Sequence, residues 1–453
     1  MLAKTSVVMF PVVILLHAWW RRGRIGRSDL AASAPFFGIS LGLGLVTLWF
    51  QQHHALQTGI LPLGGPLSRL ANAGLAAGFY LGKSVLPVAL LPAYPRWLVD
   101  PPALRQFLSA GVIAAVMVGL WCLQARRPWA RTALFGSAFI LLNLVPVLGL
   151  VAASYFHISW VADHFMYVSL VGVAGLAAAG IAAIRVPPVI WWLGLGLLFL
   201  LASSSHRYAA VFQSEENLWR YTLDREPSSW IAANNLGKTV LKAGQADAAV
   251  TLLNQARSEG PAFATADIDL NLSLALAGSG RLFEAIRRSE EAAQLRPADA
   301  GIHSNLGNLL MRAGRRAEAI EAYERAVQLQ PNSAEIESNL GTALTAEQRL
   351  PEAIDHFAAA VRLAPRDAST RNNMGIALGE AGRMPEALAA FEAAIRLAPE
   401  RADIHNNLGT TLARLGRFAE ARAQFAETVR LQPDFPSAQE NLAHATRSAM
   451  LPP

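Results

Sequence analysis

The chain has 453 residues, of which 53% are hydrophobic and only 16% charged, well below the roughly 25% of a typical soluble protein. Basic residues outnumber acidic ones only in residues 1–205, by 13 to 3, where they lie mostly in short turns between apolar runs. This placement is typical of membrane proteins and argues against nucleic-acid binding, and the one cysteine, Cys122, excludes an internal disulfide.

Seven apolar stretches in the first part of the chain are candidates for membrane-spanning helices. A helix needs about 20 mostly apolar residues to cross the hydrocarbon core of a bilayer. Trp19 and Trp20 end the first stretch, as interfacial aromatic residues do, and no cleavage site of a signal peptide follows it. The stretches are residues 2–20, 31–50, 70–91, 104–123, 132–153, 165–184 and 189–204.

The positions of lysine and arginine distinguish two arrangements of these stretches. If all seven cross, the loops on the two sides hold 5 basic residues each and give no orientation. Stretch 70–91 is the weakest candidate, because Lys83 lies within it. If it does not cross, the turns at Arg21, Arg126 and Arg185 gather 8 basic residues on one side, which the positive-inside rule places in the cytoplasm. We favour this six-crossing arrangement, which makes the C-terminal part extracytoplasmic and predicts a multi-pass bacterial inner-membrane protein.

The second part of the chain repeats with a period of 34 residues. A fixed period of this length indicates stacked helix pairs. Proline recurs at this interval at Pro297, Pro331, Pro365, Pro399 and Pro433. Asparagine, followed by leucine or methionine and a small residue, recurs in register at Asn235, Asn271, Asn305, Asn339, Asn373, Asn407 and Asn441.

Each repeat contains the residues that two packed helices require. In residues 300–333, Gly307 lets the partner helix approach closely, and Gly314 permits a left-handed turn between the helices. Tyr323 fills the space between two alanines on the second helix, and Pro331 ends that helix. The pattern resembles the tetratricopeptide repeat (TPR) family. The resemblance implies a right-handed superhelix whose concave groove binds another polypeptide.

The sequence therefore predicts an all-α fold, a polytopic membrane helix bundle followed by a TPR solenoid. The bundle covers residues 1–205 with six or seven segments, and residues 206–229 form a connector. Six repeats follow in residues 230–435, and a capping helix and tail in residues 436–453.

The sequence departs from the repeat pattern in two respects. Gln348 replaces the turn glycine of the fourth repeat. Leu253 and Ser289 replace the aromatic residue of the first two repeats, which we expect to pack more loosely or to contact the membrane part.

The asparagine column has two interpretations. In the TPR array of O-linked N-acetylglucosamine transferase, similar asparagines line the groove and hold peptide backbones, since an amide offers both a donor and an acceptor. Alternatively, the amides only satisfy polar groups between helices. We favour the first interpretation, because so many in-register copies of a poor helix former require an explanation. The predicted peptide-binding residues are Asn235, Asn271, Asn305, Asn339, Asn373 and Asn407.

The membrane part resembles a second family. The segments "AKTSVVMFPVVILL", "RLANAGLAAGFYLGKSVLPVALLPAYPRW" and "LLNLVPVLGLVAASYFHISWVADHFMYVSLVGV" look like later membrane segments of TPR-bearing GT-C glycosyltransferases, which include bacterial relatives of the TMTC O-mannosyltransferases. The resemblance implies transfer of a sugar from a polyprenyl phosphate to a protein acceptor. The family's catalytic acid lies in an early extracytoplasmic loop, and no such loop with paired acids occurs here.

Three residues are candidates for contact with a lipid phosphate. Lys4 and His164 lie where the resemblance places two family motifs, and His164 stands where the family has an arginine. Lys83 joins them because ionisable residues in membrane segments are functional by default. The alternatives are that Lys4 extends to the membrane interface and that Lys83 only lines a cavity.

Two hypotheses of function remain. The first is a membrane-tethered TPR interaction module within a protein glycosylation system. The second is an O-glycosyltransferase, O-mannosyl or O-GlcNAc in type, of which this chain is an N-terminally incomplete version. Both predict a protein or extended-peptide partner and a membrane lipid, and neither predicts a metal or cofactor, because metal-ligand clusters and phosphate-binding loops are missing from the sequence.

Overall fold

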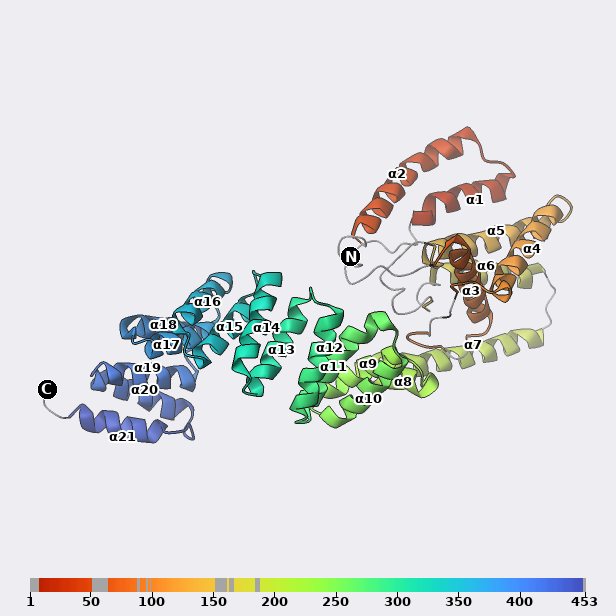
Figure 1. Cartoon of the computed structure of the whole chain (residues 1–453). Helices are drawn as coiled ribbons and strands as arrows, with labels where there is room; N and C mark the ends of the chain where they lie inside the picture. The colour runs from red at the N-terminus through yellow and green to blue at the C-terminus, as the bar shows by residue number, and fades with distance from the viewer. Residues whose placement is uncertain are drawn as a thin grey trace. The chain divides into compact units, whose positions relative to one another are not determined.

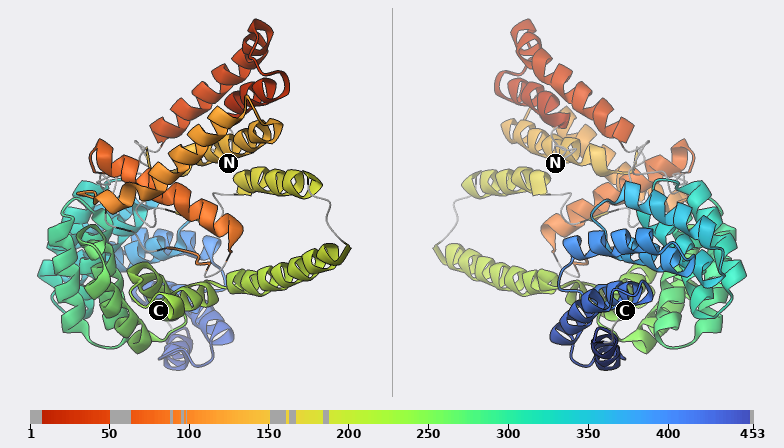
Figure 2. Two further views of the ribbon diagram at one scale, coloured as in Figure 1. Left: turned by 90° about the vertical axis from the view of Figure 1, so that its right-hand side faces the viewer. Right: turned by 90° about the vertical axis from the view of Figure 1, so that its left-hand side faces the viewer.

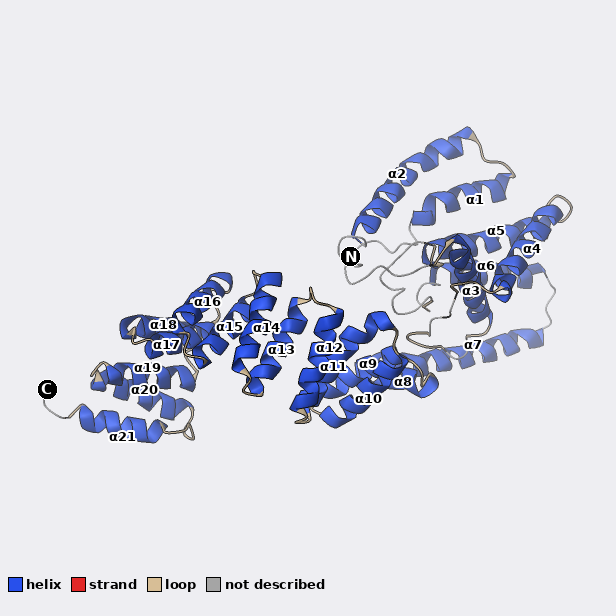
Figure 3. Ribbon diagram, in the orientation of Figure 1, coloured by secondary structure: helices blue, strands red, loops and turns tan. Residues whose placement is uncertain are grey.

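The computed structural model describes residues 8–50, 64–87, 90–94, 97, 99–150, 161–162, 167–183 and 188–450. All regular structure in these residues is helical (Figure 3), which confirms the predicted all-α class. The chain divides into two compact units, one of Met1–Thr239 with Ser258–Phe263 and one of Val240–Arg257 with Ala264–Pro453. The division falls within the first repeat, near the end of its first helix.

The first unit contains the apolar helices and the start of the repeats (Figure 1). Its helices are α1 (Phe10–Arg22), α2 (Arg27–Phe50), α3 (Pro66–Val85), α4 (Leu108–Leu123), α5 (Pro128–Leu144), α6 (Tyr167–Ala183), α7 (Pro188–Ala209), α8 (Glu215–Arg225) and α9 (Trp230–Lys242), with short 3-10 turns at η3 (Leu104–Phe107), η4 (Val145–Val147) and η7 (Ala210–Gln213).

Four helical stretches in the described residues are long and apolar enough to cross a membrane. They are Arg27–Val46, Leu104–Leu123, Pro128–Val147 and Gly194–Gln213. Helix α6 is apolar but shorter, and α3, which covers most of the doubtful stretch 70–91, does not reach this criterion.

Helix α3 supplies much of the buried core of the first unit. Small residues allow close contact, so that a Cβ on Gly74 would lie 2.8 Å from the Ala110 Cβ of α4. Tyr80 is 1% exposed, and its hydroxyl accepts a hydrogen bond of 3.0 Å from the backbone N–H of Ala162. The helix ends at Val85, so the predicted stretch 70–91 is helical only in part.

The predicted connector contains a helix, α8, that the sequence patterns did not indicate. Ser214 caps α8 by accepting a hydrogen bond of 3.1 Å from the backbone N–H of Asn217. Two glutamates, Glu215 and Glu216, occupy the first turn, where negative charge interacts favourably with the helix dipole.

The second unit is a stack of helix pairs that follow one another in chain order (Figures 1 and 2). Within the described residues, this unit contains α10, then five helix pairs from α11 to α20, and then the capping helix α21. The helices are α10 (Ala246–Glu259), α11 (Thr265–Gly278), α12 (Leu282–Leu295), α13 (Ala300–Arg312), α14 (Arg316–Leu329), α15 (Ala334–Ala346), α16 (Leu350–Leu363), α17 (Ala368–Glu380), α18 (Met384–Leu397), α19 (Ala402–Arg414), α20 (Phe418–Leu431) and α21 (Ala438–Ser448), with a 3-10 turn at η8 (Ala262–Ala264).

The turns within the pairs have the predicted left-handed geometry. Gly314 has a φ of 74°, a value that glycine adopts without steric cost. Gln348 takes the same place in the fourth repeat with a φ of 60°, although it has a Cβ. The departure from the pattern therefore changes the residue and leaves the turn unchanged.

Candidate peptide-binding face of the repeats

The asparagine column lies on the first helix of each pair, here called the A helix. The A helices α13, α15, α17 and α19 contact one another more closely than the second, or B, helices α14, α16, α18 and α20 do. The A helices therefore lie on the inner side of the stack. Asn235 lies on α9 in the other unit, and its amide donates to the Ile231 carbonyl of the same helix at 3.0 Å.

Asparagine amides connect A helices of neighbouring repeats. In each case the Nδ2 group of a column asparagine donates to the Oδ1 atom of an asparagine in the preceding repeat. The bonds join Asn339 to Asn308 (3.4 Å), Asn407 to Asn372 (2.9 Å) and Asn441 to Asn406 (3.2 Å). Asn372 and Asn406 occupy the same position of successive repeats, whereas Asn308 occupies a different one, so the first connection differs from the other two.

The other end of these amides remains available. Within the described residues, the Oδ1 atoms of Asn339 and Asn407 accept no hydrogen bond, and both side chains are half-buried. Asn373 shows the converse arrangement, because its Oδ1 atom accepts from Asn372 at 3.4 Å while its Nδ2 group donates to no described residue. An amide fixed at one end can use its other end to bind a peptide N–H or C=O group.

Asn305 has a structural role in addition. Its Nδ2 group donates to the hydroxyls of Ser273 at 3.0 Å and Ser289 at 3.3 Å, both fully buried. These hydrogen bonds replace the aromatic contact that the second repeat lacks. Leu253, at the same position of the first repeat, is also fully buried, so the expected looser packing is not seen at either position. Asn271 lies half-buried on α11.

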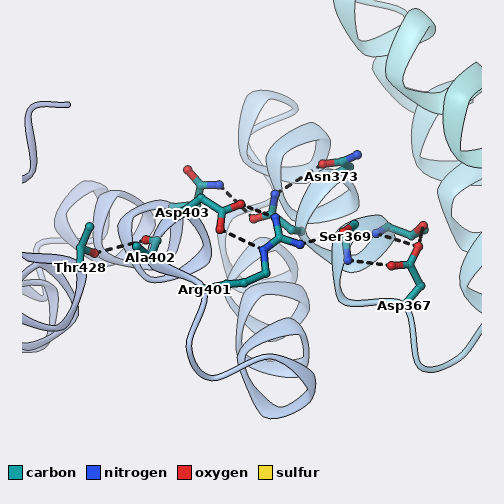
Figure 4. A network of polar contacts seen from close by, with 10 residues as sticks. Asp367, Ser369, Asn373, Arg401, Ala402, Asp403 and Thr428 are labelled. Carbon is teal, nitrogen blue, oxygen red and sulfur yellow. Dashed lines mark hydrogen bonds and ion pairs between the residues drawn. The ribbon is translucent and has the colours of Figure 1, made fainter. Parts of the chain in front are cut away.

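A polar network fixes the A helices next to Asn373 (Figure 4). Arg401, at the start of α19, donates to the Ser369 hydroxyl at 2.7 Å and to the Asp403 carboxylate at 3.0 Å. Asp367 caps α17 by accepting from the backbone N–H groups of Ser369 and Thr370. The network links the starts of two successive A helices and so sets the spacing between their asparagines.

An ion pair that joins the first and second repeats, and whose carboxylate is buried, was not predicted from the sequence. Asp269 on α11 is fully buried and accepts a hydrogen bond of 2.8 Å from Arg257. Burial raises the pKa of Asp269 above its ordinary value, although Arg257 and Arg288 act in the opposite direction. The spacing of charged residues along the sequence does not indicate this ion pair, because Asp269 and Arg257 lie on different helices.

The structure places one of the three predicted lipid-phosphate residues. The Nζ atom of Lys83 lies 5.6 Å from the centre of the Phe79 ring and 5.7 Å from that of Tyr94, within the distance of a cation–π interaction. Lys4 and His164 lie outside the described residues. Lys83 is thus in an aromatic setting, and its contact with a lipid phosphate stays a prediction.

The repeats match a known family. Residues 213–262, 304–368 and 372–445 match the family model of the tetratricopeptide repeat. The second part of the chain is a TPR array. It is accordingly a protein-interaction module, of a kind that binds peptides or proteins. The match omits the region of α11 and α12, where Ser273 and Ser289 replace the glycine and the aromatic residue of the pattern.

Solved TPR structures are similar to part of the chain. YrrB, described as a TPR protein with an unusual peptide-binding site, is 24% identical over 43% of this chain and 97% of its own, with a TM-score of 0.37. MamA from Desulfovibrio magneticus RS-1 is 24% identical over 38% and 98%, with a TM-score of 0.36. The pilF protein of Pseudomonas aeruginosa is 20% identical over 48% and 97%, with a TM-score of 0.42. No curated protein matches the chain.

Proposed function

We propose that this protein is a membrane-attached TPR module that binds an extended polypeptide through its asparagine column, with little dependence on the side chains of that polypeptide. The observation that carries the proposal is the series of A-helix amides that are fixed at one end and available at the other. Successive amides of this kind lie one repeat apart, on Asn339, Asn373 and Asn407. Amides in such a row suit the regularly spaced N–H and C=O groups of a peptide backbone.

Exposed apolar surface supports the membrane attachment. None of the stretch Leu104–Leu123 is buried, and large side chains such as Val116 and Trp121 are more than half exposed. A soluble monomer rarely exposes apolar surface of this extent, so contact with lipid is the simplest explanation.

A pocket that two turns of the first unit line together supports an extracytoplasmic position for the TPR array. Arg21, at the end of α1, and Arg126, between α4 and α5, line the same pocket, which favours an arrangement with both turns on one side of a membrane. Six crossings, with α3 not crossing, give this arrangement, whereas seven crossings put the two turns on opposite sides. The positive-inside rule then places these turns in the cytoplasm and the repeats on the other side.

The experiment compares a variant of the column with a matched control. The triple variant Asn339→Ala, Asn373→Ala and Asn407→Ala removes the available amides but spares Asn305, which bonds the buried Ser289. The control variant removes three exposed amides elsewhere in the array, Gln330→Ala, Asn332→Ala and Gln432→Ala.

The probes are arrays of unstructured 15-residue peptides, each made in an unmodified and a backbone N-methylated form, tested on the full chain purified in detergent. We expect the unmodified peptides to bind, and both N-methylation and the triple variant to weaken binding about tenfold or more, since each lost hydrogen bond is worth about 0.5–1.5 kcal/mol. Unchanged binding by the triple variant, or a loss of helical structure in it, would contradict the proposal.

The resemblance of the membrane part supports a second candidate function. In this version, the A-helix face presents a protein acceptor for transfer of a sugar from a polyprenyl phosphate. Lys83, Lys4 and His164 are then the lipid-phosphate contacts. A turnover assay of polyprenyl-phosphate sugars with the purified chain tests this candidate, and turnover that Lys83→Ala leaves unchanged would exclude the role of Lys83.

A further inference from the structure

A basic pocket opens in the first unit where the end of α1 meets the turn between α4 and α5. It has a volume of about 530 Å³, and four arginines line it, Arg21, Arg126, Arg127 and Arg131. Its lining contains no Asp or Glu, and within the described residues none of these arginines forms an ion pair. Four neighbouring positive charges without a protein counter-ion indicate an anionic ligand.

The walls of this pocket are fixed by contacts between distant parts of the chain. Arg131 donates to the Trp19 carbonyl at 2.5 Å, and its guanidinium lies 5.6 Å from the centre of the Trp19 ring. Trp20 donates to the Thr132 hydroxyl at 3.4 Å and stacks on Phe135, with ring centres 4.8 Å apart. Arg131 is therefore held in place by packed side chains on α1 and α5.

An apolar groove adjoins the basic pocket. It has a volume of about 410 Å³ and shares Trp20 and Thr132 with the basic pocket, and from there it follows α5 and α6 past Phe139 and Gly175. Helix α5 lies within Pro128–Val147, one of the stretches that can cross a membrane. In a membrane, the basic pocket at the beginning of this stretch would lie at headgroup level, and the groove would extend along the part in hydrocarbon.

We propose that the basic pocket and the apolar groove together bind one anionic phospholipid. The arginines bind the phosphate, because a guanidinium matches the geometry of phosphate oxygens with paired N–H donors. The groove holds one acyl chain, and Trp20 lies at the boundary, where an amphipathic ring has one polar and one apolar side. Basic pockets between membrane helices bind anionic headgroups in this way.

This inference rests on the membrane attachment proposed above and is independent of the asparagine column. It also differs from the predicted lipid-phosphate contact at Lys83, which lines neither the pocket nor the groove, whereas Lys4 and His164 lie outside the described residues. Lipid at this site would join α1, α5 and α6 and make the packing of the bundle depend on the composition of the membrane.

Two variants test the two parts of the site, each with a matched control. Arg126→Gln with Arg127→Gln removes two charges from the pocket, and Arg24→Gln with Arg27→Gln removes two charges from exposed arginines outside it. Gly175→Leu fills the groove, where a Cβ meets no atom within 4 Å. Gly180→Leu makes the same change on α6 outside the groove, also without a clash.

The measurement is retention of lipid by the full chain, extracted from phosphatidylcholine vesicles with or without phosphatidylglycerol and analysed by native mass spectrometry. We expect phosphatidylglycerol to be retained in preference to phosphatidylcholine, and both test variants to reduce its retention about tenfold or more while both controls leave it unchanged. Flotation of the chain with the same vesicles reports membrane attachment separately.

Each other outcome overturns the inference. Equal retention of the two lipids, or equal effects of test and control variants, would show that the arginines act only as general surface charge. Displacement of the lipid by inorganic phosphate together with normal retention in Gly175→Leu would show a free-anion site. A chain that floats with neither kind of vesicle would overturn the membrane attachment and this inference together.

Discussion

The ring of Tyr323 on α14 occupies the space in which a side chain on Gly307 of α13 would lie, since a Cβ built on Gly307 would be 2.6 Å from the Tyr323 Cε1 atom. Phenylalanine replaces tyrosine in the next three repeats, and the same relationship holds there at 2.7–2.9 Å. The glycine and the aromatic residue thus form one packing unit, which sets how closely helices A and B approach. The pairs are Gly341 with Phe357, Gly375 with Phe391 and Gly409 with Phe425.

Gly375→Ala is expected to destabilise the array although alanine favours helix formation. Its new methyl group would overlap the ring of Phe391, and overpacking of this kind costs about 1–3 kcal/mol, more than the roughly 1 kcal/mol gained in helix propensity. Gly379→Ala on the same helix is the control, because its Cβ would lie 3.9 Å from Ala387 in ordinary contact. Denaturant unfolding followed by circular dichroism should show a loss for the first variant and none for the second. Equal shifts would contradict the close approach.

Gln348→Gly is expected to stabilise the fourth repeat. Gln348 has a φ of 60°, and the left-handed conformation costs a residue with a Cβ roughly 1–2 kcal/mol. Its amide donates to Glu380 at 3.2 Å on the exposed surface, where such a contact contributes little. We expect a gain of about 1 kcal/mol in the free energy of unfolding. Gln348→Ala, which loses the amide and keeps the Cβ, should show no gain, and a gain there would refute the strain argument.

The repeat sequence predicts local features of the array, and these depend on residues within one period. The turn at Gly314, the close approach at Gly307 and the end of each helix B follow from residue types at fixed spacing. The hydrogen bonds of the asparagine column do not follow from residue types at fixed spacing. Asn305 donates to Ser289 and Asn407 to Asn372, because the acceptor depends on which side chain the neighbouring helix presents.

Sequence patterns do not predict the contacts between distant segments of the first unit. The arginines of the basic pocket come from two regions about a hundred residues apart, and contacts of Trp19 and Trp20 with Arg131, Thr132 and Phe135 bring them together. The count of basic residues predicts that the two turns lie on the same side of the membrane, but it does not predict that they line the same pocket.

The phenol of Tyr323 is expected to make the stability of the array depend on pH in alkaline solution. Burial raises the pKa of Tyr323 to about 12, and its hydroxyl donates to Asn308 at 2.6 Å. Because the folded pKa exceeds the unfolded value of about 10, its contribution to stability is complete below pH 10 and is lost as the pH rises toward 12. Between these values the chain should lose about 2 kcal/mol relative to Tyr323→Phe. Unfolding curves of both proteins measured across this range test the sign, and parallel pH profiles would show that the phenol does not titrate in this way.

The orientation of the chain can be tested at three single cysteines. In a Cys122→Ser background, Arg24→Cys lies in the turn after α1, Ala125→Cys in the turn after α4 and Gln432→Cys at the end of α20, all at exposed positions. Intact spheroplasts expressing each variant are treated with a membrane-impermeant maleimide, and permeabilised cells serve as the control for reactivity.

The six-crossing arrangement predicts labelling of Gln432→Cys in intact spheroplasts, and labelling of the two turn variants only after permeabilisation. The seven-crossing arrangement predicts that Arg24→Cys and Ala125→Cys differ, because it places their turns on opposite sides of the membrane. A difference between them would also conflict with the pocket that Arg21 and Arg126 share. Labelling of both turns in intact spheroplasts, with Gln432→Cys protected, would keep the pocket but reverse the orientation and place the TPR array in the cytoplasm.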